Sequence, residues 1–175
     1  EDTRNSRKLL THFDIHTAMT SYHEFNKYEK ADELVGLLLE GKNIALITDA
    51  GTPAISDPGE VLAIKCYEKG IRVVPIPGAV AAISALIASG QQTRRFAFEA
   101  FLPQDKKERS KVLEELKEEK RTIVIYEAPH RLVRTLELLV DTLGDDRSLT
   151  LCKELTKKHE SFIKTSLGNA LKQFT

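Results

Sequence analysis

The sequence predicts an α/β fold of two α/β domains, and three observations support this prediction. Short apolar runs typical of buried strands alternate with amphipathic stretches of helical length. The links between them are short and often marked by glycine, as expected where strands and helices alternate around a largely parallel sheet. The composition changes near residues 91–95, from small apolar residues to aromatic and highly charged segments. We therefore expect a first domain over residues 1–92 and a second over residues 93–175.

The first half is predicted to contain four helices and two strands. Leu9, Leu10 and Phe13 fall on one side of the first helix. Gly41 follows the second helix as a C-cap, and Gly70 ends the third. The first strand is a short continuous apolar run, which is typical of a strand covered on both faces, and the second strand follows Gly70. In order, the expected elements are helix 2–13, helix 24–40, strand 43–48, helix 59–69, strand 71–76 and helix 79–90.

The second half is predicted to contain four strands and three helices. "FAFEAFL" alternates aromatic residues as a strand does, and the charged helix that follows has a narrow apolar stripe at Val112, Leu113 and Leu116. Gly144 is placed to cap a later helix. In order, the expected elements are strand 96–102, helix 106–120, strand 121–130, helix 131–143, strand 148–155, strand 161–165 and a helix from residue 167.

The composition is that of an ordinary cytoplasmic protein, which is the location we expect. Hydrophobic residues make up 41% and charged residues 30%, and no apolar run approaches the roughly 18 residues of a membrane span. Cys66 and Cys152 lie far apart without a CxxC partner, as buried thiols of a reducing compartment do. Basic and acidic residues number 26 each, so net charge does not indicate a polyanion partner, although local patches remain open. We expect residues to be missing at both ends, because the chain begins and stops within helix-like segments.

The segment from Thr48 to Gly59 is the most unusual part of the sequence. It follows an apolar strand and forms two successive turns, "DAGTP" and "SDPG". Gly51 permits close backbone approach to a ligand, while the two prolines stiffen the loop. Ligands of open parallel sheets bind beyond the carboxyl ends of strands, so this loop is a candidate ligand site. Alternatively, Asp49 and Asp57 serve only as caps of turns and of the next helix.

Two further strand ends are candidates. Small residues from Pro77 to Ala82 leave helix N-terminal amides open to a ligand, or simply permit tight packing. Glu127, His130 and Arg131 lie in a polar cluster after a buried strand. Helix capping is the alternative explanation for Glu127 and Arg131, and a structural role is the alternative for His130. Dinucleotide, P-loop and hydrolase-elbow motifs are absent, and the five histidines have no spacing typical of a metal site.

Several motifs together resemble one known family. "EDTRNSRKLLTHF", "ITDAGTPAISDPGE", "VVPIPGAVAAISAL", "YEAPHRL" and "KELTKKHE" follow one another in the order seen in bacterial small-subunit ribosomal RNA cytidine 2′-O-methyltransferases. These enzymes belong to the tetrapyrrole (precorrin) methylase superfamily, whose members use S-adenosylmethionine. The resemblance implies two α/β domains with the cofactor in the cleft between them. It also implies a homodimer that acts on small-subunit ribosomal RNA, within the 30S subunit, and neither on DNA nor at a membrane.

The resemblance also implies site residues. The "VGTPIGN"-like first strand and loop of family members are absent here, and Ala50 and Thr52 replace the Gly and Asp common in tetrapyrrole members. No metal is expected. The residues expected to contact the cofactor are Asp49, Ala50, Gly51, Thr52, Ile55, Val80, Ala81, Glu127, Leu155 and Thr156.

Methyl transfer to a ribose hydroxyl gains from a general base and from cations that hold RNA. Asp49, Glu127 and His130 are the candidate bases, because each lies at a strand's carboxyl end. Tyr22, Phe25 and Tyr126 are candidates for stacking on bases. Two alternatives remain: a methyltransferase of a small substrate such as a tetrapyrrole, and a non-catalytic binding module. The candidate phosphate contacts are Arg4, Arg7, Lys157 and Lys158, with Lys8, Lys106, Lys107 and Arg109 as further cations.

Overall fold

The structure of the chain is a computed structural model that describes residues 2–175. It contains both helices and sheets, which confirms the predicted α/β class. The chain divides into two compact units, Glu1–Val80 and Ala81–Thr175. Each unit has a hydrophobic core of its own, and each is described separately below.

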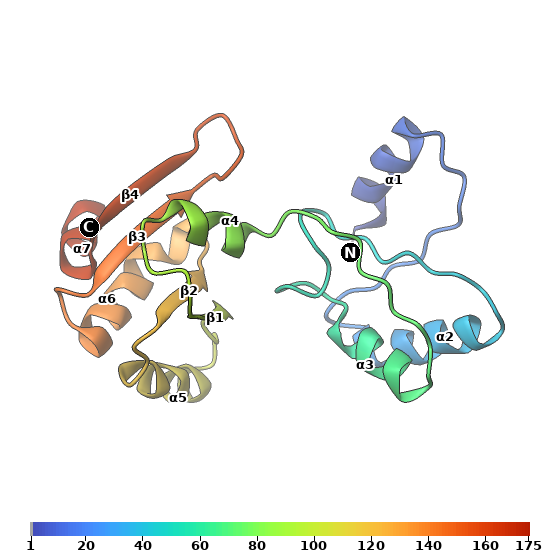
Figure 1. The fold of residues 1–175 in the computed structure, drawn as a ribbon, viewed down its shortest axis with the longest axis horizontal. Helices are drawn as coiled ribbons and strands as arrows, with labels where there is room; N and C mark the ends of the chain where they lie inside the picture. Colours follow the sequence, from blue (N-terminus) through green and yellow to red (C-terminus); the bar gives the residue numbers. More distant parts are fainter. Residues whose placement is uncertain (1) are drawn as a thin grey trace. The chain divides into compact units, whose positions relative to one another are not determined.

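The first unit contains three helices, α1 (Thr3–His12), α2 (Lys27–Leu39) and α3 (Glu60–Glu68). Helices α2 and α3 lie side by side and enclose the core (Figure 1). The glycines predicted to end them, Gly41 and Gly70, have left-handed φ values of 89° and 67°. The buried core residues are Tyr22, Ala31, Leu34, Val35, Leu62 and Cys66.

The two strands predicted in the first half do not form. Segments 43–48 and 71–76 run as irregular chain, and all paired strands among the described residues belong to the second unit. The side chains of Ile44 and Ile47 are 36% and 37% exposed, and that of Ile76 is 79% exposed. The prediction of two strands, the first of them covered on both faces, is therefore wrong. An apolar run indicates a preference for burial, but a strand also needs a backbone partner, which local sequence does not specify.

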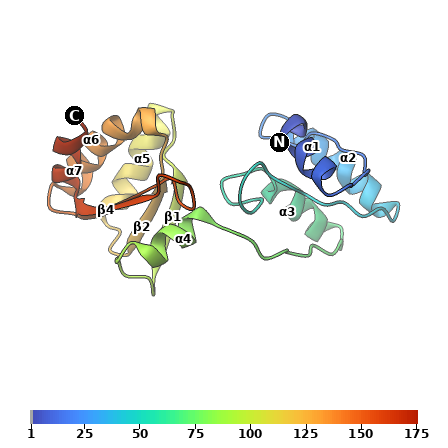
Figure 2. The same cartoon turned by 90° about the horizontal axis from the view of Figure 1, so that it is seen from above.

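The second unit contains every helix and strand predicted after residue 93, with slightly different ends. Helices α5, α6 and α7 lie next to one another with α6 in the middle, as Figure 2 also shows. Gly144 ends α6 with a φ of 84°, as expected. The elements are β1 (Phe96–Phe101), α5 (Lys106–Lys117), β2 (Thr122–Tyr126), a 3₁₀ turn (Pro129–Arg131), α6 (Leu132–Leu143), β3 (Ser148–Lys153), β4 (Ser161–Ser166) and α7 (Leu167–Phe174).

The strands pair into two small sheets. β1 and β2 are parallel, with a register shift between Phe98 and Ala100, where Ala100 has a φ of 51°. β3 and β4 are antiparallel, so the expectation of a largely parallel sheet holds for only one pair. The core between the sheets and helices is formed by Leu102, Leu113, Leu116, Leu136, Leu139, Leu167 and Ala170.

Helix α4 (Ala81–Ala88) belongs to the second unit, whereas the sequence places the boundary after residue 92. The Ala82 amide donates a hydrogen bond to Tyr126 Oη at 2.9 Å. Thr150 Oγ1 donates one to the Ser89 carbonyl, also at 2.9 Å. These contacts join α4 to β2 and β3, so the unit begins about a dozen residues before the change in composition.

Within residues 2–175, no helix combines the length and the apolar character needed to cross a bilayer. Cys66 is buried and Cys152 is half-buried, and both are free thiols. Burial raises the pKa of each thiol, which keeps both neutral at physiological pH.

Candidate functional site

The loop between Thr48 and Gly59 holds an unusual concentration of left-handed backbone. Gly51 and Gly59 have φ values of 81° and 154°, and the non-glycine residues Ala54 and Ser56 have 68° and 60°. A left-handed conformation costs a residue with a Cβ roughly 1–2 kcal/mol. Such strain persists only where surrounding structure enforces it, and it gathers at binding sites. The structure of the first unit therefore holds this loop, which the sequence predicts from its two turns, in a defined conformation.

This loop packs against the segment that ends the first unit, which is the second predicted ligand edge. Thr52 Oγ1 donates a hydrogen bond to the Ala79 carbonyl at 2.9 Å. A Cβ on Gly51 would lie 3.3 Å from that same carbonyl, and one on Gly78 would lie 3.3 Å from Thr52 Oγ1. The two segments can approach this closely because Gly51 and Gly78 have no side chains. The structure thus brings together two segments that the sequence predicts separately.

The backbone of this double segment is accessible. Gly51, Gly78 and Ala79 are exposed, and no side chain of their own covers the two glycines. Thr48 Oγ1 donates hydrogen bonds to the carbonyls of Ala50, at 3.2 Å, and Gly51, at 3.4 Å. These bonds tighten the turn at residues 48–51. A ligand with polar edges would find open peptide groups here. This fits S-adenosylmethionine, whose adenosine and amino-acid parts both form hydrogen bonds.

Gly59 fixes the other end of the loop at the start of α3. It is buried, and a Cβ there would lie 2.9 Å from Ala54 Cβ and 3.0 Å from Leu46 Cδ2. The close contact between Gly59 and Ala54 folds the second turn back on the loop. Gly59 therefore sets the shape of the segment that contains the predicted cofactor residue Ile55.

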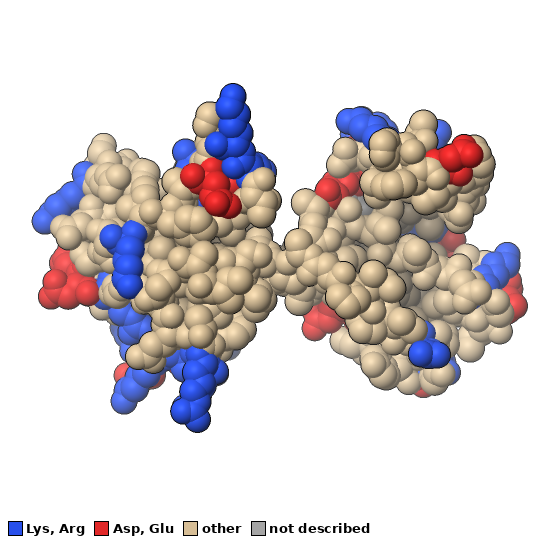
Figure 3. Space-filling model, turned by 45° about the horizontal axis from the view of Figure 1, so that its top comes forward, with Lys and Arg blue, Asp and Glu red and all other residues tan. Residues whose placement is uncertain are grey.

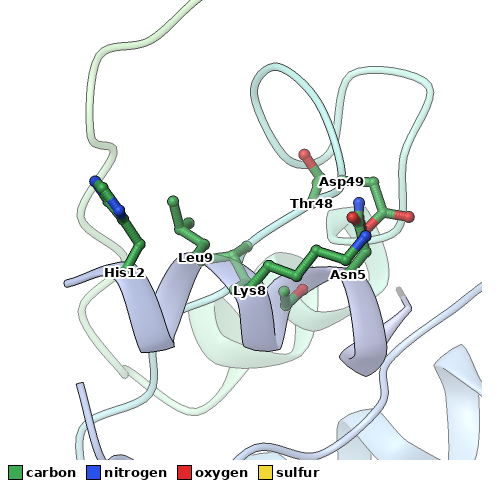
Figure 4. Close-up of a pocket in the computed structure, with 8 residues that line it drawn as sticks. Asn5, Lys8, Leu9, His12, Thr48 and Asp49 are labelled. Carbon is green, nitrogen blue, oxygen red and sulfur yellow. Dashed lines mark hydrogen bonds between the residues drawn. The ribbon is translucent and has the colours of Figure 1, made fainter. Parts of the chain in front are cut away.

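A cavity of about 380 Å³ lies where the first helix meets the start of the loop. Asn5 Nδ2 donates a hydrogen bond to Asp49 Oδ1 at 3.3 Å, which joins α1 to the loop. Figure 4 shows Lys8 extended along α1 towards Asn5 and Asp49, with His12 at the far end of the helix. The cavity is lined by Asn5, Ser6, Lys8, Leu9, His12, Ile47, Thr48 and Asp49.

In the second unit, the Glu127 carboxylate is held by three neighbours. It accepts hydrogen bonds from the Ala128 amide at 2.7 Å and from Thr135 Oγ1 at 2.5 Å. Arg131 Nε lies 2.8 Å from it in an ion pair, and the Arg131 guanidinium also lies 5.7 Å from the centre of the Phe101 ring. The Glu127 side chain is only 12% exposed. These contacts connect the end of β2 to α6, so the Glu127 carboxylate has a structural role.

Of the remaining cofactor and base candidates of the second unit, Ala81 is the first residue of α4, and the others lie on turns. His130 is exposed within the 3₁₀ turn. Glu154 and Thr156 have φ values of 52° and 63°, and the Glu160 carboxylate accepts a hydrogen bond from the Thr156 amide at 2.6 Å. Leu155 is half-buried between them. The loop after β3, like loop 48–59, therefore holds two non-glycine residues in a strained conformation.

The predicted RNA contacts differ in how available they are. Arg7, Lys157 and Lys158 are exposed, but Arg4 binds Asp2 through two hydrogen bonds of 3.1 and 2.8 Å. On the face shown in Figure 3, basic side chains form separate groups with acidic side chains between them. Any contact with a polyanion would thus be local.

The three aromatic candidates for stacking also differ. The Tyr22 side chain is 3% exposed and belongs to the core, so its predicted role in stacking is wrong. Tyr126 accepts the hydrogen bond from the Ala82 amide and is half-buried. Phe25 is 97% exposed, which leaves its ring available. Among the residues that the structure describes, no group of three or more His, Cys, Asp or Glu side chains is placed to share a metal ion.

Comparison with known proteins gives the family. The sequence profile of tetrapyrrole (corrin/porphyrin) methylases matches residues 1–171, which is nearly the whole chain. The chain belongs to the tetrapyrrole methylase family. The resemblance carried by the motifs is thereby confirmed, and the strained loop of this family member lies within the matched region.

Curated relatives of this tetrapyrrole methylase carry a narrower name. The chain is 52% identical to ribosomal RNA small subunit methyltransferase I of Synechocystis sp., over 100% of this chain and 63% of the relative. It is 51% identical to the proteins of that name from Halalkalibacterium halodurans and Haemophilus influenzae, over 98% of this chain and 59% of each relative. The chain therefore spans about three fifths of the length of these relatives.

Sequence reasoning missed the cavity on α1. It considered Lys8 only as one of many cations, and it gave Asn5 and His12 no role. A signal was present, because residues 5, 8, 9 and 12 follow the i, i+3, i+4, i+7 spacing of one helix face. The sequence could show that these residues share a face, but not that the face meets Asp49.

Proposed function

We propose that the protein of which this chain is part transfers a methyl group from S-adenosylmethionine to the 2′-hydroxyl of a cytidine ribose in small-subunit ribosomal RNA. The family supports methyl transfer, and the names of the relatives support small-subunit ribosomal RNA as the substrate. The structural observation that carries the proposal is the loop 48–59 folded against residues 78–80 with its glycine backbone exposed.

The cofactor would be held by the residues of this double segment. The bound group supplies a methyl carbon that its sulfonium already makes electrophilic. Gly51 and Thr52 would offer backbone groups, while Ile55 and Val80 would provide apolar contact. Holding the two reactants in line contributes roughly 7–11 kcal/mol to lowering such a barrier. Ala81, Glu127, Leu155 and Thr156 remain predicted contacts of the cofactor from the second unit.

We propose Asp49 as the general base. It lines the cavity on α1, and the amide of Asn5 orients its carboxylate through the 3.3 Å hydrogen bond. Glu127 is the weaker candidate because it is not among the residues that line the cavity. His130 lies on an exposed turn and is not among the residues that line the cavity. A base takes the proton of the ribose hydroxyl as the carbon–oxygen bond forms, which adds about 10²–10⁴-fold to the rate.

The same proposal includes the partners implied by the resemblance. RNA would be held by Arg4, Arg7, Lys157 and Lys158, and the substrate would be the 30S subunit. The protein would act as a homodimer in the cytoplasm. Arg7 and the two lysines are exposed, which supports their role.

The test is methyl transfer by the full-length protein with labelled S-adenosylmethionine and 30S subunits. A ribose methylated at its 2′-oxygen cannot attack the adjacent phosphate, so alkaline hydrolysis leaves the label in a dinucleotide. We expect a single labelled dinucleotide that begins with cytidine. Label in mononucleotides would place the methyl group on a base and contradict the proposal. Methylation of a tetrapyrrole but not of RNA would favour the small-substrate alternative, and absence of cofactor binding would favour a binding module.

A further inference from the structure

The cavity on α1 combines groups that suit one nucleotide of RNA. Its volume of about 380 Å³ lies in the range of small-molecule sites, which is roughly 300–1,000 Å³. Leu9 and Ile47 give it an apolar wall, and their side chains are 51% and 37% exposed. Asn5, Thr48 and Asp49 bring hydrogen-bonding groups to its other side. An apolar wall beside a few convergent polar groups is typical of a ligand pocket.

The lining of the cavity includes one cation, Lys8, which a phosphate could contact, and one carboxylate, Asp49. Lys8 is exposed and lines the cavity, and His12 lies on the same helix face one turn further along. Lys8 and His12 are four residues apart, which is about one helical turn of 5.4 Å. Both side chains therefore border the cavity, one after the other along α1. A phosphate gains from the Lys8 ammonium.

We infer that this cavity receives one nucleotide that is turned out of the RNA stack. In it, Lys8 contacts a phosphate, Leu9 and Ile47 contact the base or sugar, and the Asn5–Asp49 pair faces the ribose. Enzymes that modify a nucleotide commonly extrude it, because stacked neighbours block the reacting group. Asn5 is then a positioning residue that acts through Asp49. This inference rests on the proposed function, and it names where that function holds its substrate.

The test uses the full-length protein, a fluorescein-labelled oligoribonucleotide with a central cytidine, and two matched pairs of variants. Lys8→Gln is compared with Lys111→Gln, since Lys111 is an exposed lysine of α5. Leu9→Asp is compared with Leu39→Asp, since Leu39 is also an exposed leucine of a helix, 60% exposed in α2. RNA affinity is measured against salt, and cofactor affinity is measured by calorimetry.

We expect Lys8→Gln to weaken RNA binding by about five-fold and to lower the slope of log affinity against log salt by about 0.7. Leu9→Asp places a negative charge beside the phosphate and should weaken RNA binding at least as much. The Lys111 and Leu39 variants should bind RNA like the wild type. All four variants should bind S-adenosylmethionine as the wild type does.

Equal RNA affinity in all four variants would overturn the inference. So would a loss of cofactor affinity in Lys8→Gln with RNA affinity unchanged, because the cavity would then belong to the cofactor. Failure of the proposed function would look different. If the Lys8 and Leu9 variants lose RNA affinity while the wild type transfers no methyl group to 30S subunits, the cavity stands as an RNA site and the activity does not.

Discussion

At the scale of single residues, Gly59 has the most demanding position in the first unit. A Cβ there would meet Ala54 Cβ at 2.9 Å and Leu46 Cδ2 at 3.0 Å, and φ is 154°. We expect Gly59→Ala to lower the free energy of unfolding by about 1–3 kcal/mol through overpacking. Chemical denaturation monitored by circular dichroism measures the change.

Gly36 provides the control for this substitution. It lies within α2 and is exposed, and a Cβ there would meet nothing outside its own helix turn within 4 Å. Gly36→Ala should raise the free energy of unfolding by about 0.5–1 kcal/mol, because alanine favours a helix. If both variants change stability in the same direction, the crowding at Gly59 is not what shapes the loop.

Substitutions of Asp49 and Glu127 should have different effects, the first on catalysis and the second on stability. Asp49→Asn should reduce kcat by roughly 10²–10⁴-fold, because asparagine cannot take the proton of the ribose hydroxyl. Glu127→Gln should instead lower stability by about 1–3 kcal/mol, since it weakens the contacts with Arg131, Thr135 and Ala128. Single-turnover methyl transfer and thermal unfolding measure the two effects. A large loss of kcat in Glu127→Gln with unchanged stability would exchange the two roles.

At the scale of elements, helix α1 depends on its cap. The Asp2 side chain accepts a hydrogen bond from the Arg4 amide at 2.8 Å. Hydrogen bonding from the Arg4 side chain, and then from its amide, lowers the pKa of Asp2 from 3.8 to about 2. Because the folded pKa is the lower one, the cap stabilises α1 fully above pH 3.8 and less as the pH falls towards 2.

We therefore expect the amide protection of α1 to decrease between about pH 4 and about pH 2, as hydrogen exchange would measure. Asp2→Asn keeps a good capping residue but has no titrating group. In that variant the decrease over this pH range should be absent from α1. An identical decrease in both proteins would mean that another group controls the helix.

The elements also show which structural features the sequence could predict. Helix ends followed from glycines such as Gly41, Gly70 and Gly144, because a left-handed residue is a local requirement. The segments 43–48 and 71–76 failed as strands because pairing depends on a partner elsewhere in the chain. The antiparallel pair β3–β4 was likewise predicted as two strands without its direction. The sequence predicted features that depend on neighbouring residues, such as helix ends, but not the pairing of strands that are distant in the chain.

The candidate site shows the same division. The turns of loop 48–59 and the small residues at 77–80 were visible in the sequence, and each was predicted separately. Their contact through Thr52 and Ala79 joins positions 27 residues apart, which no local pattern specifies. The hydrogen bond between Asn5 and Asp49 spans 44 residues, so the cavity on α1 was not foreseen.

At the scale of the whole molecule, each of the two compact units has a loop in which non-glycine residues adopt left-handed backbone conformations. Ala54 and Ser56 lie in the first unit, and Glu154 and Thr156 lie in the second. The chain belongs to the tetrapyrrole methylase family, and we propose that the loop of the first unit binds the cofactor. The central claim is that the backbone at Gly51 holds S-adenosylmethionine.

Calorimetric titration of S-adenosylmethionine into the full-length protein tests this claim most directly. The variants are Gly51→Ala and Gly41→Ala. Both glycines are left-handed, but an added Cβ would lie 3.3 Å from the Ala79 carbonyl at Gly51 and would meet nothing within 4 Å at Gly41. We predict that Gly51→Ala weakens cofactor binding at least about ten-fold, equivalent to about 1.4 kcal/mol, while Gly41→Ala binds like the wild type. Equal affinity in both variants, or no binding by the wild type, would contradict the account.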